Sequence, residues 1–254
     1  MSLELDLSGK VAVVTGGSRG VGRAVARGLA RAGADVVIAS RKIDNCTAAA
    51  EEVTRETGRR ALPVAVNVSD WDDCERLYNT VYDHFGRCHV LINNAGVSPL
   101  YGGDVTKVSA ALYDKTHNVN ARGPFRLSAL FGTRMSQEDG GSIINVSTAG
   151  SWRPDTNDLP YAMAKASLNA LTLGLAGAWA PKVRVNTVLP GAVDTDITKA
   201  WGPAAKENAA AINPMKRIGM PEDYAGLCVF LASDASAYIN GAQILADGGL
   251  FRSL

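Results

Sequence analysis

The sequence has few of the residues that bind metals or cross-link chains. Its 254 residues include four cysteines and three histidines. No two cysteines form a C-x-x-C pair and the histidines do not cluster at ligand spacing, so we expect neither a metal site nor a disulfide framework. The cysteines are interpreted as free thiols of a cytoplasmic protein.

The chain also lacks an excess of either charge and a long apolar run. With 26 basic and 25 acidic residues its formal net charge is +1, so no overall field attracts nucleic acid or a membrane surface. No apolar run approaches the ~20 residues of a membrane-spanning helix. Residues 1–7 include acidic side chains and no apolar stretch, so we expect no signal peptide. The expected partner is a small molecule.

Linkers, low-complexity tracts and internal repeats are absent too, and we expect residues 1–254 to form one domain. Apolar, β-branched segments alternate with helical patterns along the whole chain, which predicts a mostly parallel sheet with helices on both faces. The predicted strands are 10–15, 34–39, 61–66, 89–92, 142–147, 183–189 and 243–246. The fold expected is therefore a Rossmann-type, doubly wound α/β fold with seven strands. The two longest predicted helices are 107–137 and 160–179.

A glycine-rich loop follows the first predicted strand. It reads Gly16-Gly-Ser-Arg-Gly20-Val-Gly22 and leads into a helical pattern. Glycines at such a turn let the backbone approach a pyrophosphate, which then meets the helix N-terminus. The loop predicts dinucleotide binding, although its Gly-x-x-x-Gly-x-Gly spacing leaves a plain strand-to-helix turn as an alternative.

The second predicted strand lacks an acidic residue at its end. A carboxylate there would bind the ribose diol of NAD, but the sequence has Ser40 followed by Arg41, and the glycine loop carries Arg19. Guanidinium groups hold a phosphate by charge-assisted hydrogen bonds. We therefore expect NADP(H) to be preferred over NAD(H). The alternative is that both arginines are solvated surface residues.

Tyr161 and Lys165 are four residues apart in a predicted helix, so their side chains share one face. An ammonium beside a phenol stabilises the phenolate and lowers a pKa that starts at ~10, which suits a general acid or base. From this spacing alone, a solvated surface pair is the alternative.

Six motifs in order give the chain a resemblance to the single-domain short-chain dehydrogenases/reductases, including members similar to 3-oxoacyl carrier protein reductases. The motifs are Thr15–Gly22, Asn93–Gly96, Asn120, Ser147-Thr148, Tyr161-x-x-x-Lys165 and Pro190–Thr195. The resemblance runs from about Gly9 to Gly249.

The resemblance implies catalytic roles for several of these residues. Tyr161 would be the general acid/base, Lys165 would lower its pKa and hold the nicotinamide ribose, and Asn120 would hold a water in a proton relay. The family's catalytic serine usually lies thirteen positions before the tyrosine, where this chain has Thr148. Alignment on the following Ala-Gly pair selects Ser147 instead. Either hydroxyl can serve, and Thr148 is slightly preferred.

The resemblance also implies a set of cofactor-binding residues. They are Gly16, Ser18, Arg19, Gly20, Val21, Gly22, Ser40, Arg41, Asn67, Val68, Asn94, Ala95, Gly96, Tyr161, Lys165, Pro190, Gly191, Val193 and Thr195. Asn67 stands where relatives have an aspartate, and its amide oxygen is expected to accept a hydrogen bond from the adenine amino group.

The function expected is NADP(H)-dependent hydride transfer between nicotinamide and a carbonyl/secondary alcohol pair. The alternatives are a catalytically silent NADP(H)-binding sensor and a lyase or epimerase on the same scaffold. Segments 97–101, 152–159 and 196–215 are the expected substrate walls, with 196–215 as a lid. Trp152, Leu159 and Trp201 would make the substrate partly apolar, whereas Arg153 and Lys199 are candidates for holding an anion. A homotetramer or homodimer is implied by the resemblance.

Overall fold

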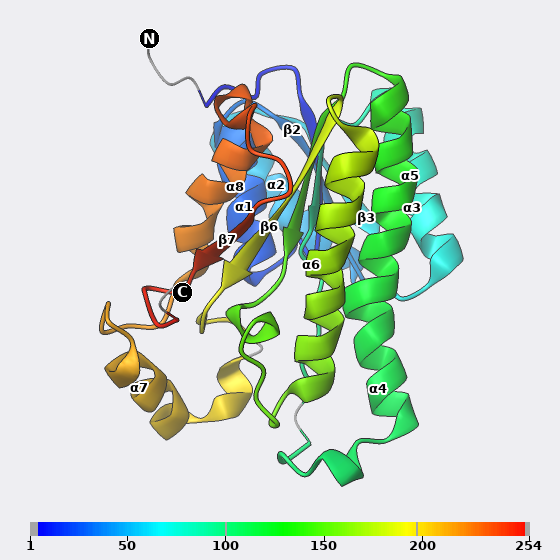
Figure 1. Ribbon diagram of the computed structural model, residues 1–254. Coiled ribbons are helices and arrows are strands. Elements are labelled where there is room, and N and C mark those ends of the chain that lie inside the picture. Colours follow the sequence, from blue (N-terminus) through cyan, green and yellow to red (C-terminus); the bar gives the residue numbers. More distant parts are fainter. Residues whose placement is uncertain (1–4, 100, 197, 252–254) are drawn as a thin grey trace.

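Seven parallel strands form a single sheet in the order β3-β2-β1-β4-β5-β6-β7 (Figure 1). The computed structural model describes residues 5–99, 101–196 and 198–251. The strands are β1 (Val11–Thr15), β2 (Asp35–Ser40), β3 (Ala61–Ala65), β4 (Val90–Asn93), β5 (Gly141–Val146), β6 (Val183–Pro190) and β7 (Gln243–Ala246). Chain order reverses between β1 and β4, which is the point where doubly wound sheets bind ligands. The predicted fold class is confirmed, and every strand pair is parallel.

Burial along the strands follows their place in the sheet. All five residues of central β1 are buried, as expected for a strand covered on both faces. Edge strand β3 is mostly half-buried and contains Pro63, a residue that cannot donate a ladder hydrogen bond and is therefore tolerated at an edge. The fully buried strand therefore lies inside the sheet and the half-buried one at its edge.

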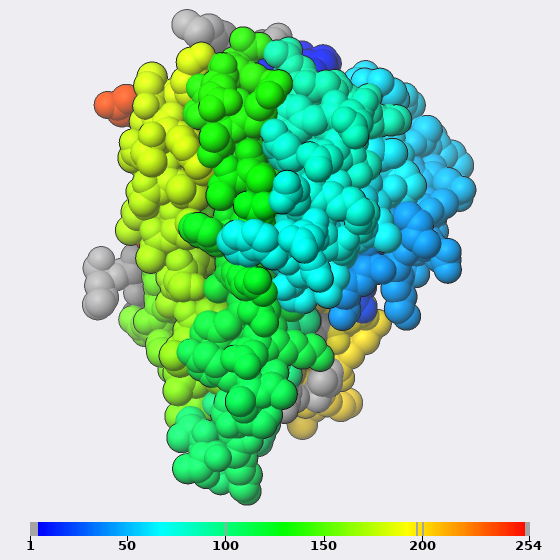
Figure 2. Space-filling model, turned by 90° about the vertical axis from the view of Figure 1, so that its right-hand side faces the viewer, coloured from blue at the N-terminus to red at the C-terminus, as the bar shows by residue number. Residues whose placement is uncertain are grey.

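Helices cover both faces of the sheet. The α-helices of the described ranges are α1 (Gly20–Arg31), α2 (Ile43–Thr57), α3 (Trp71–Phe85), α4 (Ala110–His117), α5 (Gly123–Gln137), α6 (Leu159–Trp179), α7 (Pro203–Ile212) and α8 (Ala225–Ala232). Of these, α7 lies beyond the end of the sheet rather than on a face (Figure 1). Ala12 and Val14 of β1 share a core with Leu29 of α1, whereas Val13 shares the opposite core with Phe131 of α5. Figure 2 shows α3, α5 and α6 over that second face. No helix in the described ranges is long and apolar enough to cross a membrane.

The helix predicted over 107–137 is interrupted, so that prediction is wrong in detail. A 3-10 turn at Val105–Lys107 and helix α4 precede a π-helical turn at Asn118–Arg122, after which α5 begins. Pro124 has no N–H to donate to the carbonyl four residues earlier, so a regular α-helix cannot pass through this point. The interruption falls beside a predicted site residue, Asn120.

The segment predicted as a lid is partly helical. A 3-10 turn at Thr198–Trp201 is followed by α7, while Ile197 lies outside the described residues. Leu100, in the predicted wall 97–101, also lies outside the described ranges, as do residues 1–4, in the N-terminal segment where no signal peptide is expected. All four cysteines are free and buried: Cys46, Cys74, Cys88 and Cys228.

Candidate active site

A cavity of about 550 Å³ lies at the carboxyl edge of the sheet and gathers most of the predicted site. The predicted cofactor residues that line it are Gly16, Arg19, Gly20, Val21, Ser40, Arg41, Asn67, Val68, Asn94, Ala95, Gly96, Tyr161, Lys165, Pro190, Gly191, Val193 and Thr195. Ser147 and Thr148 line it as well. Ser18, Gly22 and Asn120 lie outside this lining.

The glycine loop is held close to the end of β4. Asn94 donates a 2.9 Å hydrogen bond from Nδ2 to the Thr15 carbonyl, and the Thr15 hydroxyl accepts from the Asn94 and Ala95 N–H groups. A Cβ on Gly22 would lie 2.3 Å from the Gly16 carbonyl oxygen. Since no side chain fits there, only glycine at position 22 lets the loop pack this closely, although Gly22 does not itself line the cavity.

The start of α1 is suited to an anion. Its N-cap residue, Arg19, makes no side-chain capping hydrogen bond, so the first-turn N–H groups remain available to a phosphate. A close glycine backbone and an uncapped helix N-terminus fit the pyrophosphate of a nicotinamide dinucleotide.

The two candidate phosphate-binding arginines differ in their partners. Arg19 forms a 2.9 Å ion pair with Asp196 of the predicted lid, and Asp196 also pairs with Lys199. Within the described ranges no carboxylate pairs with Arg41, which lines the cavity next to Ser40. Of the two guanidinium groups, that of Arg19 is held in an ion pair and that of Arg41 is not, within the described ranges.

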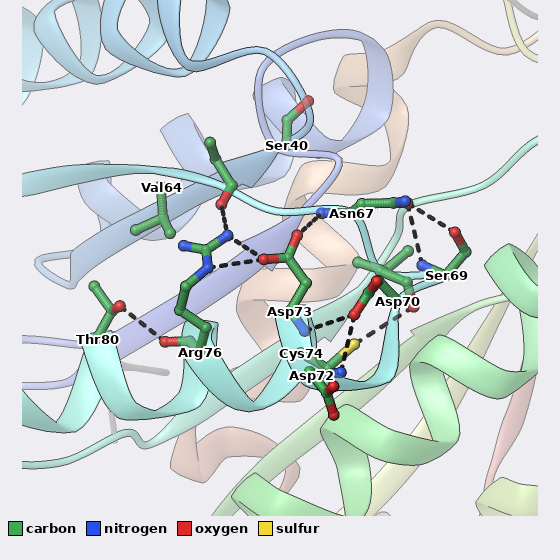
Figure 3. A network of polar contacts seen from close by, with 12 residues as sticks. Ser40, Val64, Asn67, Ser69, Asp70, Asp72, Asp73, Cys74, Arg76 and Thr80 are labelled. Atoms are coloured by element: carbon green, nitrogen blue, oxygen red, sulfur yellow. Dashed lines mark hydrogen bonds and ion pairs between the residues drawn. The ribbon is translucent and has the colours of Figure 1, made fainter.

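The amide oxygen of Asn67 is already engaged by its own turn (Figure 3). It accepts from the Ser69 hydroxyl at 2.8 Å and from the Ser69 N–H at 3.3 Å, which uses both lone pairs. The Asn67 N–H donates to Asp73, and Arg76 joins Asp73 to the Ala65 carbonyl. The expectation that this oxygen accepts from adenine is wrong for this conformation, because the turn that links β3 to α3 uses it.

Lys165 lies below Tyr161 on α6, with its Nζ 5.8 Å from the centre of the tyrosine ring. Its Nζ donates a 2.7 Å hydrogen bond to the Val146 carbonyl. Burial lowers the pKa of Lys165 to about 8. Burial also raises the pKa of Tyr161, and the carboxylate of Asp158 raises it further. The expected lowering of the Tyr161 pKa is therefore not seen, because desolvation dominates and the lysine is directed to Val146.

The two candidate hydroxyls have different surroundings. Ser147 is buried, and its Oγ lies 3.1 Å from the Lys165 carbonyl and 3.4 Å from the Ser151 hydroxyl. Thr148 is half-buried, and its Oγ1 accepts from the Gly150 N–H at 3.2 Å. An acceptor contact leaves the threonine O–H proton free to donate, whereas the serine proton has carbonyl and hydroxyl acceptors within reach.

Asn120 is fully buried in the π-turn and fixes the loop after β4. Its Nδ2 donates to the Val97 and Thr116 carbonyls, each at 2.8 Å, and its Oδ1 accepts from the Val97 N–H at 3.2 Å. A Cβ on Gly96 would lie 3.0 Å from Asn120 Oδ1 and 3.7 Å from Lys165 Nζ. The asparagine oxygen and the lysine amine thus both lie close to Gly96.

The expected substrate walls are only partly correct. Trp201 and Arg153 line the cavity, but Trp152, Leu159 and Lys199 do not. Trp152 instead donates from its indole to Gln243. Asp155 and Asp158 of the predicted wall 152–159 line the cavity, although neither residue was singled out from the sequence. Leu250 and Phe251 also line it and were missed. Asp158 lies three residues before Tyr161, a spacing that places it near the tyrosine at the start of a helix.

Within the described ranges, no three histidine, cysteine, aspartate or glutamate side chains gather as metal ligands. The cavity offers hydroxyl, phenol, amine and carboxylate groups beside the glycine loop and the N-terminus of α1. These groups suit proton transfer coupled to a reaction at a bound cofactor.

Comparisons with known proteins agree with this geometry. Residues 16–251 match the family model described as Enoyl-(Acyl carrier protein) reductase. L-rhamnose 1-dehydrogenase (NAD(P)(+)) of Azotobacter vinelandii is 38% identical over 96% of this chain and 98% of its own. The 3-oxoacyl-[acyl-carrier-protein] reductase of Aquifex aeolicus is 32% identical over 98% and 100%.

A solved structure shows the same likeness. The crystal structure of L-sorbose reductase from Gluconobacter frateurii, complexed with NADPH and L-sorbose, matches with a TM-score of 0.91 at 29% identity, over 99% of this chain and all of that one. The fold, the motifs and the near-complete coverage agree. The chain belongs to the family that the matching model describes and is a member of the short-chain dehydrogenases/reductases, which are NAD(P)-binding oxidoreductases.

Proposed function

We propose that this chain transfers a hydride between NADP(H) and a carbonyl/secondary alcohol pair, with Tyr161 as the general acid/base. The observation that carries the proposal is a single cavity whose lining includes both the glycine loop with Arg41 and the pair Thr148 and Tyr161. A cofactor bound along the loop would extend toward the tyrosine. The related L-sorbose reductase, whose structure contains NADPH and a sugar, supports both the cofactor and the type of substrate.

The protein's own groups would handle the proton. A bound nicotinamide supplies or takes the hydride at the carbonyl carbon. Thr148 donates a hydrogen bond to the substrate oxygen, and Tyr161 gives that oxygen its phenolic proton as negative charge develops. Lys165 and the oxygen of Asn120 both lie close to Gly96, and they support a path by which the tyrosine regains its proton. In the oxidative direction each transfer is reversed.

A substrate panel tests the function. The protein is mixed with NADPH and with ketones, 3-oxoacyl thioesters and quinones, and loss of NADPH absorbance is followed. Turnover on at least one carbonyl class is expected. Tight NADPH binding without turnover on any of them would instead favour the silent sensor.

Arg41→Ala is expected to raise the Kd for NADPH by about 10- to 100-fold, because charge-assisted hydrogen bonds contribute about 1.5–3 kcal/mol and about 1.4 kcal/mol is tenfold. The Kd for NADH should change by less than about twofold, since NADH has no 2′-phosphate for Arg41 to contact. Titration of cofactor fluorescence measures both. Lys42→Ala removes a neighbouring positive charge outside the cavity lining and is the control. An equal loss of affinity for both cofactors at Arg41→Ala would refute the NADP(H) preference.

We also propose a homo-oligomer, a tetramer or a dimer, with residues 196–215 as the substrate lid. Phe125 of α5 and Met163 and Leu173 of α6 are 49%, 45% and 55% exposed. Figure 2 shows the two helices side by side on one surface of the molecule. Apolar side chains on such a face support burial against a second copy. Light scattering of the purified protein should give a multiple of 26.6 kDa; a monomer mass at micromolar concentration would exclude this assembly.

A further inference from the structure

Asp158 is a carboxylate in the cavity wall without a partner from another residue. It lies just before α6, three residues ahead of Tyr161, and is half-buried. Within the described ranges, no other residue donates a hydrogen bond or forms an ion pair with its side chain. The backbone N–H of Asp158 itself acts as a donor to this carboxylate, which leaves further acceptor positions unused. Half-buried carboxylates normally find donors, because an unpaired acceptor loses hydration without compensation.

The start of α6 explains why this side chain is not used as a cap. An aspartate at an N-cap usually accepts from the second or third N–H of its helix. Here the second helical residue is Pro160, which has no N–H, and the third, Tyr161, donates to the backbone carbonyl of Asp158 at 2.8 Å. The Ala162 N–H donates to the same carbonyl at 3.0 Å. The carboxylate is therefore left available to a molecule in the cavity.

The neighbouring charges do not neutralise Asp158. Asp155, also in the lining, accepts from the Asn157 N–H and Nδ2 at 2.8 and 2.6 Å. Arg153 lies over the ring of Phe251, 5.4 Å from its centre, and in the described part of the chain pairs with neither aspartate. Burial and the negative charge of Asp155 raise the pKa of Asp158. The cavity lining thus holds two carboxylates that accept hydrogen bonds, Asp155 and Asp158, together with the cationic side chains of Lys115 and Arg153.

A cavity wall with such a carboxylate favours substrates that can donate hydrogen bonds to it. Hydroxyl groups of a substrate can donate to the Asp158 carboxylate, whereas an anionic group placed against it would be repelled. A plain acyl chain would bury the carboxylate unpaired, at a cost of roughly 1–3 kcal/mol.

We propose that Asp158 is a specificity-determining residue that accepts hydrogen bonds from hydroxyl groups beside the reacting carbonyl. The substrate class is then an uncharged, polyhydroxylated ketone or aldehyde and the corresponding alcohol. This inference rests on the proposed function and names the substrates of the same site. It replaces the partly apolar or anionic substrate expected from the sequence.

Matched pairs of ketones test the inference. Reduction by NADPH is measured for 1,3-dihydroxyacetone against acetone and for erythrulose against 2-butanone, with wild type, Asp158→Ala and Asp158→Asn. Asp158→Ala should lower kcat/KM for the hydroxylated ketones by about 10- to 100-fold, mainly through KM, because a hydrogen bond to a charged group is lost. The plain ketones should change by less than about twofold. Asp158→Asn, which keeps an acceptor, should lie between.

Asp83→Ala is the control, since it removes an exposed carboxylate from α3 outside the cavity lining. An equal loss for hydroxylated and plain ketones at Asp158→Ala would show a structural role and overturn the inference. Wild-type preference for 3-oxoacyl thioesters, or failure to reduce either hydroxylated ketone, would overturn the substrate class and leave the proposed function standing. No reduction of any carbonyl would overturn the proposed function itself.

Discussion

Tyr161→Phe is expected to lower kcat by about 10²- to 10⁴-fold, the usual contribution of a positioned general acid. The change removes one oxygen that makes no hydrogen bond to another described residue, so the fold and the cavity should persist. The Kd for NADPH should stay within about threefold, because the glycine loop and Arg41 remain. Steady-state reduction of the best carbonyl of the panel gives kcat, and cofactor fluorescence gives the Kd.

A surface tyrosine provides the matched control. Tyr113 on α4 is 38% exposed and stacks on His117, so Tyr113→Phe should leave kcat near that of the wild type. Unchanged turnover in Tyr161→Phe would remove the tyrosine from the mechanism. Loss of NADPH binding together with turnover would mean that the substitution damages the cavity, and the assigned proton role would then lack support.

The same assay separates the two hydroxyls. Thr148→Ala should lower kcat by about 10- to 10³-fold, because a donor to the developing oxyanion is lost, and Thr148→Ser should retain most of it. Ser147→Ala removes a hydroxyl whose contacts are to the Lys165 carbonyl and Ser151, so it should lower thermal stability more than kcat. The reverse pattern would transfer the role to Ser147.

Much of the scaffold could be predicted because its signals are local. Continuous apolar runs marked the buried strands, and glycines marked the tight turn between β1 and α1. Helix interruption at Asn118–Arg122 was missed, although Pro124 is visible in the sequence, because the apolar pattern runs through it. The family resemblance also predicted that the glycine loop and Tyr161 would lie in one site, and both line the cavity.

Side-chain partners were not predictable in the same way. The oxygen of Asn67 has the right chemistry for adenine, but its use by Ser69 depends on the turn geometry. Asp158 is the N-cap residue of α6, a position where an aspartate side chain usually caps the helix, but the backbone hydrogen bonds of Tyr161 and Ala162 show that its carboxylate is not needed there. The direction of the Tyr161 pKa depends on burial, which spacing alone does not report.

Lys165→Met is expected to abolish most turnover. It should also change how the free energy of unfolding depends on pH. Burial lowers the pKa of Lys165 to about 8, from its ordinary value of 10.5. Between these two values the unfolded chain keeps a proton that the folded protein has lost, so the folded state gains stability as pH rises through this window. Below about pH 8 both states are protonated, and the charged amine is held in the interior at a cost.

The difference in unfolding free energy between wild type and Lys165→Met should therefore move in favour of the wild type by about 1 kcal/mol per pH unit between pH 8 and 10. Urea unfolding at pH 7, 8, 9 and 10 measures it, and the comparison cancels groups that both proteins share. Met cannot satisfy the Val146 carbonyl that Lys165 contacts at 2.7 Å, but that loss shifts the difference by a constant. Lys182→Met, at an exposed lysine, should give a curve parallel to the wild type. A parallel curve for Lys165→Met would mean that its amine is as well solvated in the folded protein as in the unfolded chain, and that Tyr161 has an ordinary ammonium beside it.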